Sequence, residues 1–99
     1  MKGYLTANYT IHDPEAYQKY VQAVMPAISQ YGGRLIIGDP SSKVLEGQPN
    51  QMIVVVEFES VDAAERFYNS PEYTEAKRLR ISAAKGWVAI TKEFEVPKH

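Results

Sequence analysis

Two stretches of this sequence begin in nearly the same way, and together they limit what the chain can fold into. "DPEAYQKY" (residues 13–20) and "SPEYTEAKRLR" (residues 70–80) each open with an Asp or Ser, a proline and a glutamate. The Asp or Ser can accept a hydrogen bond from an orphan backbone N–H, proline fits the first helical turn, and glutamate suits the positive end of the helix dipole. We therefore predict two helices that begin sharply, at Pro14 and Pro71.

Between and around these starts, the side-chain pattern indicates strands. Residues 2–11 alternate between an apolar and a mixed side, and residues 34–39 form a short apolar run. Residues 51–60, "QMIVVVEFES", give the strongest strand pattern in the chain, and residues 86–96 give a last long strand. A small additional strand is expected at residues 43–45, inside a long turn.

The helical stretches add three expectations. Pro26 should kink the first helix or end its regular part, and Gly32-Gly33 should form its C-terminal cap. Ser60 should cap a short helix over Val61–Asn69 that precedes the one starting at Pro71. The resulting order, βαββαβ with a split second helix, predicts one α+β domain over residues 1–99, a ferredoxin-like sandwich with helices on one face of an antiparallel sheet.

Composition narrows the function classes. Eleven Lys and Arg against twelve Asp and Glu give a net charge of −1, which does not favour nucleic acid or an anionic membrane as a partner. The absence of cysteine excludes disulfides, thiolate metal sites and a cysteine nucleophile. The N-terminus lacks the apolar core of a signal peptide, and no apolar run approaches a membrane span, so we expect a cytoplasmic protein.

The second face of the sheet does not suit a monomer. Met52, Val54, Val56 and Phe58 make one apolar face of the third strand, but Ile53 and Val55 line the other face before Glu57, where Tyr4, Ile36 and Trp87 are expected to join them. Exposed apolar patches of this kind usually mark an interface. We expect a homodimer in which two sheets pack face to face into a barrel. Its apolar walls and few polar groups would resemble a small-molecule pocket.

Several words of the sequence, in this order, resemble the domain-of-unknown-function family 1330: "DPEAYQKY", "YGGR", "VLEG", "VVEF…S", "FYNSPEYTEAKRLR" and the closing "VAI" strand. The similarity runs from about Gly3 to Phe94. The resemblance implies the dimeric α/β-barrel superfamily, in which ferredoxin-like sheets pair. That superfamily includes small isomerases and monooxygenases that often need no cofactor. The family has no agreed reaction, so the resemblance implies an architecture and leaves the chemistry open.

Glu57 is the first candidate for acid–base chemistry, because it interrupts the apolar run of the third strand on the face expected to line the barrel. A carboxylate there would have a raised pKa unless it is paired, which suits a general acid or base. Arg34, on a neighbouring strand, is the expected partner. The alternative is a structural ion pair or a water-facing residue.

His12 is the second candidate base, at the end of the first strand, although a surface residue preceding the Asp13 cap is the simpler interpretation. One histidine and scattered carboxylates show no metal-ligand spacing, so no metal is expected, and no cofactor either.

The predicted ligand-binding residues are aromatic and polar. Tyr73 sits at a helix start, and Arg80 falls on a nearby turn where it could hold a carboxylate. Arg34 is a second anion-holding candidate, and three further residues are expected at the walls of the pocket: Tyr4, Trp87 and Asn8. The basic side of the last helix is interpreted as a solvated, ion-paired surface.

The sequence therefore leads to one function hypothesis and one alternative. The hypothesis is a homodimer that binds a small, partly aromatic or carboxylate-bearing metabolite between sheet and helices, and acts on it by proton transfer as an isomerase or cofactor-free monooxygenase does. The alternative is a non-catalytic binding or assembly module whose barrel is filled by side chains.

Overall fold

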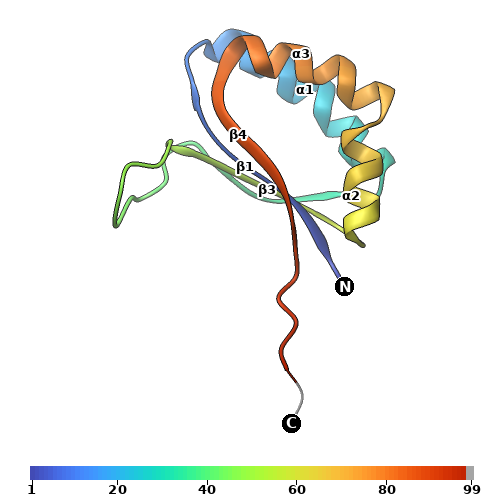
Figure 1. Ribbon diagram of the computed structural model, residues 1–99. Coiled ribbons are helices and arrows are strands. Elements are labelled where there is room, and N and C mark those ends of the chain that lie inside the picture. Colours follow the sequence, from blue (N-terminus) through green and yellow to red (C-terminus); the bar gives the residue numbers. More distant parts are fainter. Residues whose placement is uncertain (98–99) are drawn as a thin grey trace.

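In the computed structural model, which describes residues 1–97, three helices cover one face of a four-stranded antiparallel sheet (Figure 1). The strands are β1 (Gly3–Ile11), β2 (Arg34–Asp39), β3 (Met52–Phe58) and β4 (Ala84–Lys92). The helices are α1 (Pro14–Gln30), α2 (Val61–Tyr68) and α3 (Pro71–Ala83). The spatial order of the strands is β2-β3-β1-β4, with β1 antiparallel to both of its neighbours. The predicted ferredoxin-like order with a split second helix is confirmed.

The repeated helix starts work as their composition predicts. The Asp13 carboxylate accepts a hydrogen bond from the Ala16 N–H at 3.1 Å, and the Ser60 hydroxyl accepts one from the Ala63 N–H at 3.0 Å. Ser70 is buried and bonds in both directions: its hydroxyl donates to the Phe67 carbonyl and accepts from the N–H of Tyr73 at 3.1 Å. These caps satisfy backbone donors that would otherwise lack partners at the helix starts.

α1 does not end at Pro26, as one form of the prediction had it, because the helix continues to Gln30. Proline inside a helix costs about 3 kcal/mol through a lost hydrogen bond and a clash with the preceding turn. Pro26 is exposed, whereas Val24, Ala27 and Ile28 on the opposite side of the helix are buried against the sheet. Burial of these side chains on both sides of the proline offsets its local cost.

Two strand predictions also need correction. Residues 43–45 do not form a strand; they lie in an exposed loop after β2. The last strand begins at Ala84 and ends at Lys92, earlier than predicted at both ends, because its pairing with β1 runs from Ile11 opposite Ala84 to Gly3 opposite Lys92. An irregularity between Leu35 and Ile37 puts Ile37, and not Ile36, opposite Val55.

The main core lies between the sheet and the helices. It combines large side chains from the sheet and from all three helices: Leu5, Val56, Phe58, Tyr20, Val24, Ile28, Phe67 and Tyr73. The opposite face of the sheet, which we call the outer face, has no helix over it in the described part of the chain (Figure 1). Apolar side chains remain accessible there: Trp87 is 52% exposed and Ile37 is 43% exposed. The fold thus has one covered and one uncovered apolar face.

Candidate functional site

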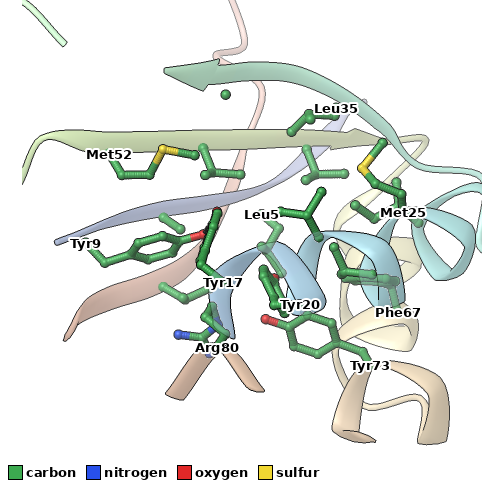
Figure 2. A pocket seen from close by; sticks show the side chains of 18 residues that line it. Leu5, Tyr9, Tyr17, Tyr20, Met25, Leu35, Met52, Phe67, Tyr73 and Arg80 are labelled. Carbon is green, nitrogen blue, oxygen red and sulfur yellow. Dashed lines mark hydrogen bonds between the residues drawn. The ribbon is translucent and has the colours of Figure 1, made fainter. Parts of the chain in front are cut away.

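A cavity of about 140 Å³ lies between the sheet and helices α1 and α3 (Figure 2). Most of its wall is apolar, and its polar side chains are four tyrosines and one arginine. The apolar wall comes mainly from alternate residues of the strands, including Leu5, Ala7, Val54, Val56 and Val88, and from Val24 and Ile28 of α1. Such a wall with a few polar groups is typical of a small-molecule pocket.

The polar side chains reach the cavity because each lies on the inward face of its element. Tyr9 follows Leu5 and Ala7 on the buried side of β1. Tyr17 and Tyr20 are three residues apart on α1, and Tyr73 and Arg80 are seven residues apart on α3, so each pair shares a helix face. In Figure 2 the labelled side chains of these residues converge from three elements.

The tyrosines form two connected groups. The Tyr9 and Tyr17 hydroxyls are hydrogen-bonded at 2.7 Å, and the Tyr17 ring packs on Tyr20 with centroids 5.5 Å apart. Tyr73 packs instead on Phe67, with centroids 4.8 Å apart. The Arg80 guanidinium lies over the Tyr9 ring, its carbon Cζ 5.9 Å from the centroid. Aromatic contacts of this kind fix the orientation of the polar groups around the cavity.

Two buried donors at this site lack a partner. Among the described residues, the Tyr73 hydroxyl and the Arg80 Nε are the buried side-chain polar atoms with no hydrogen bond. Tyr73 is only 1% exposed. Leaving a buried polar group unpaired lowers stability by about 1–3 kcal/mol, so such groups are rare in native proteins and can indicate a site for a binding partner.

Burial also sets the protonation of the site. Desolvation raises the pKa of Tyr9, Tyr17 and Tyr20 above the ordinary value of 10.0. These hydroxyls therefore stay protonated and can donate. For Arg80, burial acts to lower the pKa, but the neighbouring Tyr73 and further tyrosines outweigh this effect, so the pKa is raised and the side chain remains a cation.

The cavity reaches the surface beside the edge strand β2. Met25 of α1 and Leu35 of β2 line it and are each 40% exposed. Figure 2 shows these two side chains on the side of the cavity away from Arg80. A ligand that enters here meets apolar side chains first and the arginine last.

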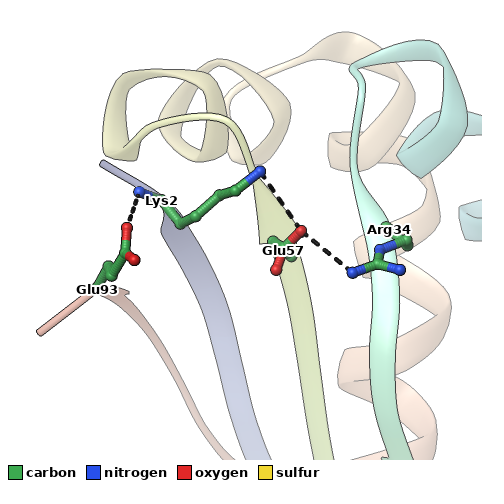
Figure 3. A network of polar contacts seen from close by, with 4 residues as sticks. All are labelled: Lys2, Arg34, Glu57 and Glu93. Carbon is green, nitrogen blue, oxygen red and sulfur yellow. Dashed lines mark hydrogen bonds and ion pairs between the residues drawn. The ribbon is translucent and has the colours of Figure 1, made fainter.

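Glu57 and Arg34 lie on the outer face, away from this cavity. The strand register aligns Arg34, Glu57 and Tyr4 in one row across β2, β3 and β1, and directly opposed residues share a face. The Glu57 Oε1 lies 3.4 Å from the Arg34 Nη2 and 3.7 Å from the Lys2 Nζ (Figure 3). Glu57 is therefore an ion-paired residue of the outer face.

Trp87 and Asn8 occupy a second row of the outer face, because the register pairs them directly. Asn8 is buried, and its amide donates to the backbone carbonyls of Asn50 and Met52 at 2.7 and 2.9 Å. Its carbonyl accepts from the Asn50 N–H at 3.1 Å. Asn8 thus fastens the loop before β3 to the sheet.

His12 is exposed at the end of β1, in a shallow surface hollow with Thr10, Asn50 and Lys85. Of the predicted site residues, the structure brings together Tyr73 and Arg80 in the cavity, and it gathers Glu57, Arg34 and Tyr4 on the opposite face.

Tyr9, Tyr17 and Tyr20 line the cavity, although the sequence pattern did not predict them as site residues. The usable signal was their position: Tyr9 on the apolar side of the first strand, and Tyr17 and Tyr20 on the inward stripe of the helix that follows.

Within residues 1–97, no group of three His, Cys, Asp or Glu residues could hold a metal ion. The same part of the chain has no helix that is long and apolar enough to cross a membrane.

Solved structures share this fold across nearly the whole chain. A protein of unknown function from Rhodopseudomonas palustris matches with a TM-score of 0.78 at 18% identity, over 96% of this chain and 84% of that one. The cofactor-independent oxygenase SnoaB from Streptomyces nogalater matches with a TM-score of 0.68 at 9% identity, over 96% and 95% of the two chains.

A dimeric protein of unknown function and ferredoxin-like fold from Bacteroides fragilis matches with a TM-score of 0.55 at 10% identity, over 93% and 96% of the chains. No curated protein matches this sequence. The model of the "Domain of unknown function (DUF1330)" matches residues 2–94. Together with the fold, this match shows that the chain belongs to the DUF1330 family.

Proposed function

We propose that the protein binds a small organic molecule in the cavity between the sheet and helices α1 and α3. The observation that carries this proposal is a cavity of about 140 Å³ with an apolar wall, four tyrosines and one arginine. An apolar cavity of roughly 150 Å³, engineered in another protein, binds benzene. The volume therefore suits a molecule with one six-membered ring.

The proposed assembly is a homodimer joined through the outer face. Trp87 and Ile37 are accessible there, and half-buried Ile53 and Val55 complete an apolar surface beside them. A second copy would cover this surface, and a structure of the same fold that is itself described as dimeric supports assembly into a dimer. In such a dimer, Glu57 and Arg34 of both copies would line the interior between the sheets.

Proton transfer in the manner of an isomerase or cofactor-free oxygenase is the second candidate function. It is supported by Glu57, a carboxylate held between two cations and only 20% exposed, on the face proposed to be enclosed. The oxygenase SnoaB shares the fold, which makes this chemistry compatible with the scaffold. Glu57→Gln should then abolish turnover and leave ligand binding in the cavity unchanged.

If the two sheets instead enclose only side chains, the protein is a non-catalytic binding or assembly module. Glu57→Gln should in that case lower the free energy of unfolding, because Arg34 and Lys2 lose the carboxylate with which they pair.

Cavity filling tests the binding function directly. Ala7 is 2% exposed and lines the cavity, so the flexible side chain of Ala7→Met would occupy the empty volume. Titration of benzamide, followed by amide NMR shifts, should show binding to the wild type and at least about tenfold weaker binding to Ala7→Met. The control is Ala23→Met, on the exposed side of α1, which should bind as the wild type does. Equal binding by Ala7→Met would contradict the proposal.

A further inference from the structure

We infer that the molecule held in this cavity is an anion, a small planar carboxylate whose charged group lies against Arg80 and Tyr73. This inference rests on the proposed binding function and specifies the chemical class of its ligand.

The charge of the cavity wall is unbalanced. Arg80 is the one charged side chain among the lining residues, and within residues 1–97 it forms no ion pair. Arg78, two positions earlier on α3, is exposed and does form an ion pair: its Nη1 lies 3.6 Å from the Glu75 Oε2. A cation held beside an apolar wall is costly unless an anion compensates it. The compensating charge is the ligand's.

The unpaired donors lie where that anion would bind. The Arg80 Nε and the Tyr73 hydroxyl are both buried and lack a partner in the described part of the chain. An ionised carboxylate is an acceptor-only group with two oxygens, so it can take one hydrogen bond from each of these donors. Charge-assisted hydrogen bonds of this kind are about twice as strong as neutral ones.

The remaining polar groups match an acceptor too. Burial keeps Tyr9, Tyr17 and Tyr20 protonated by raising the pKa of each hydroxyl. Tyr9 and Tyr17 are already bonded to each other, and one of those hydroxyls retains a proton that is free to donate. No Asp, Glu or His lines the cavity among residues 1–97, so an anion meets no opposing charge.

Both donors come from one face of α3, because Tyr73 and Arg80 lie seven residues, or two turns, apart on this helix. The Arg80 side chain is held in place by the Tyr9 ring. The rest of the wall is apolar, which suits the ring or short chain of the ligand.

Benzoate and benzamide test the inference, because they share a ring and have head groups of similar shape that differ in charge. Binding of each is followed by amide NMR shifts at neutral pH. We expect the wild type to bind benzoate at least about tenfold more tightly than benzamide, as expected for a charge-assisted pair. Arg80→Gln should remove this preference, and Tyr73→Phe should weaken benzoate binding about threefold to tenfold with less effect on benzamide.

Matched controls are available in the same chain. Arg78→Gln removes an exposed arginine of the same helix, and Tyr31→Phe removes a hydroxyl that bonds Glu72 outside the cavity. Both should keep the preference for benzoate. Equal affinity for the two probes, or a preference that survives in Arg80→Gln, would overturn the anion inference and leave the binding function standing. If neither probe binds, or if Ala7→Met binds both as the wild type does, the binding function fails together with the inference.

Discussion

The hydroxyl oxygens of Tyr9 and Tyr17 lie 2.7 Å apart and join the central strand β1 to helix α1 at one end of the cavity. Each hydroxyl satisfies the other in a part-buried place, and the two rings meet edge to face with centroids 5.8 Å apart. The Tyr73 hydroxyl, in the same cavity, has no such partner. Loss of the hydroxyl is therefore expected to affect half-buried Tyr17 and buried Tyr73 in opposite ways.

Tyr17→Phe is expected to lower the free energy of unfolding by about 1 kcal/mol, because it strands the Tyr9 hydroxyl. Tyr73→Phe is expected to leave that free energy equal or slightly higher, because it removes a buried group that is already unpaired. Urea denaturation of both variants without ligand measures the difference. A loss in Tyr73→Phe as large as that in Tyr17→Phe would show that the Tyr73 hydroxyl is bonded in the free protein.

Asn8→Ala is expected to destabilise the protein by about 2 kcal/mol or more, since three hydrogen bonds of one buried amide are lost and backbone groups of Asn50 and Met52 are left unpaired. Amide exchange in the loop over residues 40–51 should accelerate at the same time. Thr10→Ala is the control, because its exposed hydroxyl bonds only the Asn50 side chain, and its cost should stay within about 0.5 kcal/mol. An Asn8→Ala variant as stable as Thr10→Ala would contradict a structural role for Asn8.

Stability is expected to fall as the pH rises above the ordinary tyrosine pKa of 10.0. Below that pH, the buried tyrosines are protonated in both folded and unfolded chains, so they cause no change in the free energy of unfolding with pH. Above it, the unfolded chain loses these protons while burial keeps them on Tyr9 and Tyr20 in the folded chain. The folded state then binds more protons than the unfolded state, so the free energy of unfolding decreases as the pH rises.

Thermal unfolding between pH 8 and pH 11, with a parallel ultraviolet titration of tyrosinate, checks this behaviour. Tyr9→Phe should flatten the pH dependence. An absorbance change near pH 10 that accounts for all seven tyrosines while the protein is still folded would refute the prediction that the buried tyrosines stay protonated.

Val55→Lys is expected to convert the proposed dimer into a monomer, because it places a charge in the centre of the outer face. Sedimentation velocity should give the mass of two chains for the wild type and of one chain for the variant. Leu45→Lys is the control: Leu45 is 84% exposed in the loop after β2 and should leave the assembly unchanged. A wild type that sediments as a monomer would contradict the assembly.

The order of the elements was predictable because its signals are local. Asp13, Ser60 and Ser70 cap helices through bonds to residues three positions ahead, and strand alternation is visible within a few residues. The failures arose where distant contacts override a local preference. α1 passes through Pro26 because the residues around it are buried by the sheet, and residues 43–45 form no strand because no strand of the described chain pairs with them.

The candidate site was predictable only in part. The shared face of Tyr73 and Arg80 follows from helical spacing, so the sequence alone indicated that they could act together. The third strand is apolar on both sides, with Val54 and Val56 on one face and Ile53 and Val55 on the other. Nothing in such a pattern states which side the helices cover, so residues of both faces were assigned to one pocket.

The sequence by itself determined the helix starts, the strand order along the chain and the membership of each residue in one of two faces, because these depend on neighbours within a few positions. Only the tertiary structure decided that α1 and α3 close over the face bearing Tyr9, leaving Glu57 and Arg34 on the other. It also decided that Tyr73 and Arg80 end without partners beside a cavity. Burial and pairing depend on which segments meet in space, and that is set by packing over the whole chain.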